Sequence, residues 1–269
     1  MPRHHCQRPP RRHPSLRTMA AAAVVVAAAT SCTPGVTVVA TPAGPLTQAE
    51  RTGFRETSSH ESVLAFLDTL QRTGRVAYGV MGKTTEGRDL AYVIVSRPVY
   101  LTPASAHASG RPIVFVQGNI HSGEVEGKEA LQALVRDLAL APGRNVLDSI
   151  VLIALPNYNA DGNERLAPQA RNRGAQNGPE MVGTRPNATG LNLNRDYMKA
   201  DAPETRAALA LFNAWDPHVF VDLHTTNGSY HGYHLTYAPS LNPAAELPGA
   251  TFGGAWARDS LLPELRRRV

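Results

Sequence analysis

The sequence predicts an α/β domain whose sheet is mixed but mostly parallel and is flanked by helices. Three nearly continuous apolar runs, typical of strands covered on both faces, alternate with segments that follow a helical period. Two β-type runs joined by a short polar turn precede them, which indicates an antiparallel hairpin. Alternation of buried strands with helices is the pattern of a largely parallel sheet.

The expected elements follow one another in a regular order. A helix opens the domain over 60–71, where apolar residues recur at helical spacing. The hairpin follows, with its polar turn at 83–88. The other expected elements alternate along the chain: strand 112–120, helix 125–141, strand 149–156, helix 202–215 and strand 218–224. The helix over 125–141 stops at Pro142-Gly143, a pair that ends helices.

The first 32 residues are typical of an export signal. Five arginines without any acidic residue precede the short apolar stretch MAAAAVVVAAATSC, which is too short for a permanent membrane span. Cleavage of a lipoprotein type would leave Cys32 as the first residue and allow a lipid anchor there, whereas cleavage after Ala29 would leave Thr30. Both cysteines, Cys6 and Cys32, lie in this region, so we expect no internal disulfide in the exported body.

The rest of the chain divides into a linker and one domain. Residues 33–57 are rich in Pro, Thr, Ala and Gly and show no clear period, which predicts a linker. Residues 58–269 are expected to form the domain. Of the 27 Lys and Arg residues, five lie in the signal, and the other 22 balance 22 Asp and Glu residues. A nucleic-acid partner therefore has no support from the charge.

Polar residues follow three of the expected strands. His121 comes just after the first buried strand, 157–161 come after the next, and His224 ends the third. Open α/β sheets bind ligands at the carboxyl ends of their strands, because loops from several strands converge there. These residues are therefore expected to form one site.

The residue types in that site suggest a metal. His121 and Glu124 are three positions apart with only Ser122 and Gly123 between them, and His224 follows 100 positions after Glu124. Two histidines and one glutamate form a known catalytic zinc set that leaves a fourth position open. Taken singly, Glu124 is equally compatible with a helix cap, and His224 with an ordinary strand-end histidine.

Four motifs together resemble the zinc carboxypeptidases of the carboxypeptidase A type. They are GNIHSGEVEGKEA, PNYNADGNER, GLNLNRDY and DLHTTNG, in that order, and the resemblance runs from about His60 into the last third of the chain. It implies one Zn²⁺ per chain, held by His121, Glu124 and His224. It also implies the fold of that family and hydrolysis of C-terminal residues from peptides by zinc-activated water.

The resemblance also implies the residues that bind the substrate. Asn194 and Arg195 match the pair that holds the free C-terminal carboxylate, which a planar guanidinium grips with two parallel hydrogen bonds. Arg173, with Arg171 as the alternative, is assigned to polarise the scissile carbonyl. Asn192 stands where some members have an aspartate, and its amide oxygen is expected to accept a hydrogen bond from a zinc histidine.

One part of the machinery is not found in the sequence. The family places its general-base glutamate well beyond the third ligand, but only Glu246 and Glu264 follow His224, and neither has a recognisable context. We therefore expect a C-terminally truncated catalytic domain, with no assigned catalytic residue. The alternatives are a naturally short member, a zinc amidase or deacylase on the same fold, and a non-catalytic module that binds zinc or peptides.

The expected location follows from the signal. An exported metallocarboxypeptidase would act in the periplasm or outside the cell, or stay attached to the envelope through a lipid on Cys32. Its expected partner is a peptide with a free C-terminal carboxylate, with no nucleic acid involved.

Overall fold

The computed structural model describes residues 43–174 and 178–225, together with residues 236, 238, 263, 264 and 267. All of these belong to a unit that spans 41–269. The expected export signal and the first part of the expected linker lie outside the described residues. None of the helices in the described part of the chain is both long and apolar enough to cross a bilayer.

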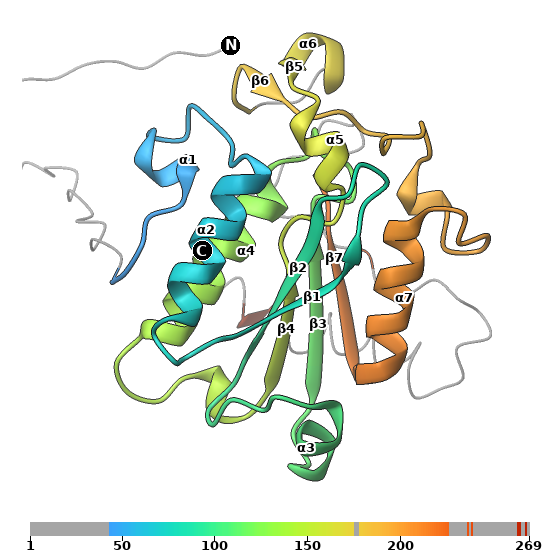
Figure 1. Cartoon of the computed structure of the whole chain (residues 1–269). Coiled ribbons are helices and arrows are strands. Elements are labelled where there is room, and N and C mark those ends of the chain that lie inside the picture. Colours follow the sequence, from blue (N-terminus) through green and yellow to red (C-terminus); the bar gives the residue numbers. More distant parts are fainter. Residues whose placement is uncertain are drawn as a thin grey trace, which may run out of the picture. The chain divides into compact units, whose positions relative to one another are not determined.

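The domain is built on a five-stranded mixed sheet (Figure 1). The strands are β1 (Ala77–Lys83), β2 (Asp89–Val95), β3 (Ile113–Gly118), β4 (Val151–Leu155) and β7 (Val219–Leu223), and their spatial order is β1-β2-β4-β3-β7. β1 and β2 form the expected hairpin, and β2 is also antiparallel to β4. β3 is parallel to both β4 and β7. The α/β fold with an initial antiparallel hairpin is therefore confirmed.

Helices cover both faces of this sheet. α2 (His60–Gln71) and α4 (Glu126–Leu140) lie on one face, and α7 (Pro203–Trp215) lies on the other (Figure 1). The expected helices over 60–71, 125–141 and 202–215 are these three, and their ends agree to within a residue or two.

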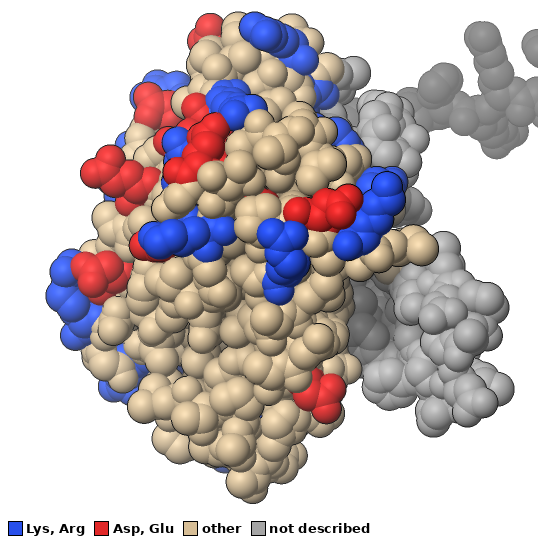
Figure 2. Space-filling view, turned by 45° about the vertical axis from the view of Figure 1, so that its right-hand side comes forward, with Lys and Arg blue, Asp and Glu red and all other residues tan. Residues whose placement is uncertain are grey.

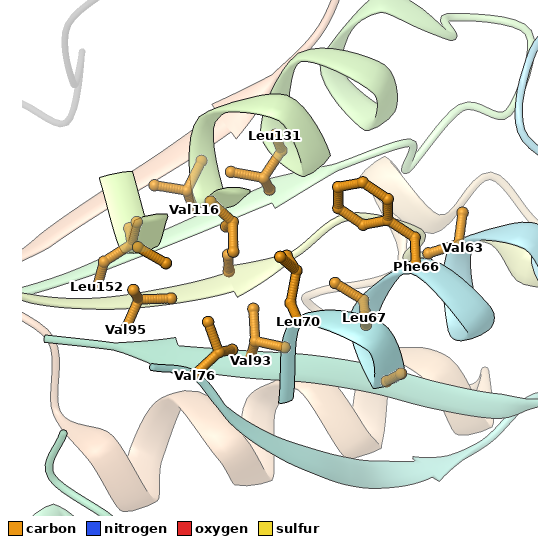
Figure 3. Packing of buried hydrophobic residues seen from close by; sticks show 14 of the residues in the cluster. Val63, Phe66, Leu67, Leu70, Val76, Val93, Val95, Val116, Leu131 and Leu152 are labelled. Carbon is orange, nitrogen blue, oxygen red and sulfur yellow. The ribbon is translucent and has the colours of Figure 1, made fainter. Parts of the chain in front are cut away.

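The inner strands β2, β3 and β4 supply both layers of the core, because successive side chains point to opposite faces. β7, expected to be covered on both faces, instead lies at an edge of the described sheet with Val219, Phe220 and Val221 exposed. Val93 and Val95 of β2 pack with α2 and α4, whereas Ile94 between them packs on the side of α7. Figure 3 shows the first layer, in which Leu70 of α2 and Leu131 of α4 meet the valines of the sheet. Both leucines are fully buried, and truncating such a side chain typically costs about 2–5 kcal/mol.

The shorter elements lie mainly in the connections. They are α1 (Gln48–Arg51), α3 (Pro103–Ala108), η1 (Val146–Asp148), α5 (Ala160–Glu164), β5 (Ala167–Pro168), α6 (Gln169–Asn172), β6 (Met181–Val182) and η2 (Leu193–Arg195). β5 and β6 pair as a separate two-stranded sheet. None of these elements was expected from the sequence.

The linker prediction is wrong for residues 43–57, because helix α1 lies within them. Thr47 and Glu50 form a capping box at its start. The Glu50 carboxylate receives two hydrogen bonds from the guanidinium of Arg136 on α4, which is almost fully buried. The ion pair between buried Arg136 and Glu50 holds residues 43–57 against the domain. The composition of the segment does not show that such a pair forms.

Charged side chains of both signs are interspersed on the face of the molecule drawn in Figure 2. Residues of opposite sign also form ion pairs near the surface, for example Arg165 with Glu86 at 2.6 Å. Such a distribution agrees with the balanced charge of the sequence outside its first residues.

Candidate metal centre

Two chain segments converge at the carboxyl ends of the neighbouring strands β3 and β7. His121 and Glu124 lie on the turn between β3 and α4, where the Glu124 amide donates to the His121 carbonyl at 2.8 Å. His224 comes directly after β7, which runs parallel to β3. Gly127 in the first turn of α4 allows this approach, since a side chain there would meet Leu223 of β7 at 2.7 Å.

The ligand atoms of His121, Glu124 and His224 form a compact group. All lie within 4.8 Å of one another. The Nδ1 atom of each histidine faces one oxygen of the Glu124 carboxylate, both at 3.0 Å. His121 and Glu124 are buried, whereas His224 is exposed. Two imidazole nitrogens and a carboxylate oxygen are the donor set that zinc prefers, so these residues fit a zinc ion.

Glu124 is not a helix cap. The residue that caps α4 is Val125, without a side-chain hydrogen bond. The Glu124 carboxylate instead contacts both histidines and accepts a hydrogen bond from the Thr225 amide at 3.1 Å. Burial opposes its ionisation, but these hydrogen bonds hold the pKa of Glu124 far below its ordinary value. Glu124 therefore offers a negative charge to the centre.

A separate side chain contacts the outer nitrogen of each histidine. The Nε2 atom of His121 lies 3.0 Å from the Asn192 amide oxygen, in the arrangement expected from the sequence. The Nε2 atom of His224 lies 2.7 Å from the Asp222 carboxylate. The carboxylates of Asp222 and then Glu124 raise the pKa of His224 to about 9. Such partners fix the orientation of a metal-binding imidazole and raise its basicity.

Asp222 was not among the residues predicted from the sequence. A signal was available, because residues two apart on a strand share a face and an acid therefore stands beside His224 in VDLH.

The arginines differ from the expectation. The guanidinium of Arg173 contacts Glu126, and its side chain is only 3% exposed. Arg171, the alternative, lies at an exposed position of α6. Arg185 contacts the centre instead, donating to Glu124 Oε1 at 3.2 Å from a side chain that is 50% exposed. Arg185 and Asn192 lie on the same loop. Because Asn192 was expected beside a zinc histidine, its closeness to Arg185 in the sequence could have indicated that Arg185 lies near the centre as well.

The predicted Asn-Arg pair lies beside the exposed histidine. Asn194 Nδ2 is 3.4 Å from His224 Nε2. Arg195 is exposed, and its guanidinium contacts the Asn194 carbonyl at 2.7 Å. An amide and a guanidinium thus stand next to the candidate metal group.

A family model described as zinc carboxypeptidase matches residues 63–247. This range covers more than half of the chain and includes the three candidate ligands. The chain therefore belongs to the zinc carboxypeptidase family.

Relatives and solved structures agree with this assignment. Carboxypeptidase 2 of Trichophyton rubrum is 28% identical over 172 residues, which cover 61% of this chain and 28% of that protein. Carboxypeptidase Z of Mus musculus is 31% identical over 52% of this chain and 21% of its own length. A metallo-carboxypeptidase from Burkholderia cenocepacia is 25% identical, with a TM-score of 0.51 over 65% of this chain and 43% of that one. The chain thus spans under a third of the length of these curated relatives.

Proposed function

We propose that this chain is the metal-binding part of an exported zinc carboxypeptidase that removes C-terminal residues from peptides. The observation that best supports this proposal is that His121, Glu124 and His224 lie close together in a chain of this family. The similarity to known relatives supports the reaction class, since both relatives named above are carboxypeptidases. The basic, then apolar, first 32 residues support export.

His121, Glu124 and His224 would hold one zinc ion per chain. A bound zinc ion supplies Lewis acidity, which polarises a carbonyl and activates water. The negative charge of the ionised Glu124 would attract the cation. Asn192 and Asp222 would orient the two imidazoles toward it.

Asn194 and Arg195 would bind the substrate's free carboxylate. Arg195 is exposed beside the centre, and a guanidinium forms strong paired hydrogen bonds with a carboxylate. For the role of polarising the scissile carbonyl we now favour Arg185 over Arg173. Arg185 combines contact with Glu124 and a half-exposed side chain, whereas Arg173 faces Glu126. A cation placed there would stabilise developing negative charge on the carbonyl oxygen.

No general base is assigned among the described residues. Glu264 contacts Arg267, and Glu246 lies outside the described part of the chain.

Calorimetry with the zinc-loaded chain tests this function. A peptide with a free C-terminal carboxylate should bind, and the same peptide with an amidated C-terminus should bind more weakly, because it lacks the charge that Arg195 recognises. Mass spectrometry of the incubated peptide would show whether the last residue is released. Equal binding of the acid and the amide would refute the carboxypeptidase assignment, and release of an acyl group instead would favour an amidase or deacylase.

A further inference from the structure

A connected set of buried polar side chains lies behind the loop that carries His121. Its members come from α2, from the end of β3, from α4 and from the segment after β4, and each is at most 8% exposed. We call them the amide scaffold: His60, Asn119, Lys128, Asn157 and Asn163. Within the part of the chain that the structure describes, no hydrogen bond joins them to His121, Glu124 or His224, and the proposed reaction does not use them.

The donor and acceptor roles in the amide scaffold follow from Lys128. Its ammonium can only donate, so the atom of Asn163 that it contacts is the amide oxygen. The amide nitrogen of Asn163 then faces acceptors, the Ser58 carbonyl at 3.1 Å and the Glu164 carboxylate at 2.9 Å. Only one orientation of the Asn163 side-chain amide therefore satisfies its hydrogen bonds to Lys128, Ser58 and Glu164.

The same orientation propagates through Asn119 to His60. Asn119 Nδ2 donates to the oxygens of Asn163 at 3.1 Å and Asn157 at 2.6 Å. Asn157 Nδ2 then donates to His60 Nδ1 at 3.2 Å, so that nitrogen carries no proton. Burial also lowers the pKa of His60, which agrees with a neutral ring. One buried ammonium thus sets the hydrogen-bond direction of the whole scaffold.

Asn119 joins the amide scaffold to the metal-bearing loop. It lies two residues before His121 with a φ of 65°, a left-handed conformation that few residues other than Gly, Asn and Asp adopt. Its carbonyl accepts from the Asn159 amide at 3.1 Å, and the Ser122 hydroxyl donates to the Asn159 carbonyl at 2.7 Å. Contacts on both sides of His121 therefore attach the loop to the segment after β4.

We propose that Asn119, Asn163 and Lys128 are positioning residues that set the loop of His121 and Glu124 in its metal-binding geometry before a metal ion arrives. The inference rests on the proposed zinc-binding role of His121 and Glu124. Burying an ammonium is costly unless it is hydrogen-bonded, and Lys128 donates to the Ser58 carbonyl at 2.6 Å and to Asn163. Asn163 and Asn157 have partners that permit one amide orientation each, which favours a single arrangement of this segment, whereas His60 Nε2 and Asn119 Oδ1 have no partner among the described residues. Preorganised ligands bind a metal more tightly because less ordering remains to be done.

The decisive variant is Asn119→Gly in the full chain. Glycine adopts the left-handed conformation without strain, so this change removes the amide and leaves the backbone conformation accessible. We expect a zinc dissociation constant raised about tenfold, within the range typical for partners that orient metal ligands. The visible absorption of the Co²⁺-loaded chain should also change, since it reports the geometry of the ligands. Lys128→Met should give the same signature.

Arg136→Met is the matched control. Arg136 is another almost fully buried basic residue of α4, but its partners are Glu50, Asp137 and the Pro45 carbonyl, none of which belongs to the amide scaffold. It should lower the free energy of unfolding without changing the Co²⁺ spectrum. This contrast separates positioning of the loop from general stability.

Hydrogen exchange on the metal-free chain gives an independent reading. The backbone amides of 119–124 should exchange faster in Asn119→Gly and Lys128→Met than in the parent, and at the parental rate in Arg136→Met. If the parent binds no zinc, the proposed function fails, yet this measurement still decides whether the amide scaffold holds the loop. Parental exchange, together with an unchanged Co²⁺ spectrum where cobalt binds, would refute the proposal, as would equal effects of Arg136→Met.

Discussion

The two histidines of the candidate metal centre are held in contrasting ways. His121 is buried, its outer nitrogen faces the neutral amide of Asn192, and the amide scaffold lies behind its loop. His224 is exposed at the end of β7, and its outer nitrogen faces the carboxylate of Asp222. The same ligand type is thus positioned by packing and hydrogen bonds on one side and by a charge on the other.

This difference predicts separate contributions to metal binding. A rigid, neutral environment fixes where a ligand stands, whereas a carboxylate partner raises the basicity of the imidazole that it contacts. The substrate-binding candidates Asn194 and Arg195 lie on the exposed side, next to His224. We therefore expect changes near His121 to affect folding and metal binding together, and changes near His224 to affect mainly metal and substrate binding.

The largest effect should come from removing either histidine. His121→Ala and His224→Ala should each abolish stoichiometric zinc, measured by metal analysis after dialysis. At about pH 10, where His224 has lost the proton that Asp222 and Glu124 stabilise, only His121→Ala should also destabilise the metal-free chain, by about 1–3 kcal/mol, because it leaves buried polar partners unsatisfied. Urea unfolding measures that difference. Stoichiometric zinc that survives His224→Ala would contradict the ligand assignment, and equal destabilisation by both variants would remove the contrast between the two sides.

Exchanging the partners of the histidines should change zinc affinity in opposite directions. Asp222→Asn removes the carboxylate and should weaken zinc binding by roughly 10–100-fold. Asn192→Asp places a carboxylate against His121 and should strengthen binding, because the imidazole becomes a better donor. Competition with a chelating dye measures both. Two outcomes would contradict the idea that a carboxylate partner raises zinc affinity. One is that Asp222→Asn has no effect, and the other is that Asn192→Asp weakens zinc binding while the fold stays intact.

Arg195→Ala tests whether the exposed side binds substrate. Loss of a charge-assisted hydrogen bond typically costs roughly 1.5–3 kcal/mol, so a peptide with a free C-terminal carboxylate should bind correspondingly more weakly. The free energy of unfolding and the zinc content should stay at their parental values, since Arg195 is exposed. Calorimetry with the zinc-loaded chain measures the binding, and Arg206→Ala, an exposed arginine on α7, is the control. A similar loss in the control would show that only general charge matters.

The parts of the fold that the sequence predicts are those set by local pattern. The helix over 60–71 and the strands around Phe115 and Ile153 follow from apolar periodicity, because burial of those side chains is decided by the sheet and helices themselves. The candidate ligands were also predictable, since His121 and Glu124 lie on the connection that follows β3 and His224 directly follows β7.

The parts that were missed depend on contacts between distant residues. Helix α1 is too short to be stable alone, and its Glu50 pairs with Arg136, which lies 86 residues further along the chain. Arg173 and Arg185 have similar sequence contexts in irregular segments. Only the folded loop shows that Arg185 contacts Glu124 while Arg173 contacts Glu126. Local periodicity contains no information about such pairs.

The last prediction concerns the pH dependence of stability on the His121 side. Burial lowers the pKa of Lys128 to about 8, although Glu129 and Glu164 oppose the shift. Its ordinary value of 10.5 applies in the unfolded chain, so between these two values the unfolded chain binds more protons than the folded one. The contribution of Lys128 to stability should therefore rise with pH across this window, and it should be lost as the pH falls through about 8.

The measurement is urea unfolding of the metal-free parent and Lys128→Met between pH 7 and pH 10. The difference in unfolding free energy between the two should shift in favour of the parent by about 2 kcal/mol, since one pKa unit corresponds to about 1.4 kcal/mol. Buried tyrosines also titrate at high pH, but they are common to both proteins and cancel. Arg136→Met is again the control. Despite burial, Glu50 and Asp137 hold the pKa of Arg136 above its ordinary value. The difference in unfolding free energy between the parent and Arg136→Met should therefore not change with pH. A flat difference for Lys128→Met as well would mean that water reaches the ammonium, and the environment behind His121 would then be no drier than that around His224.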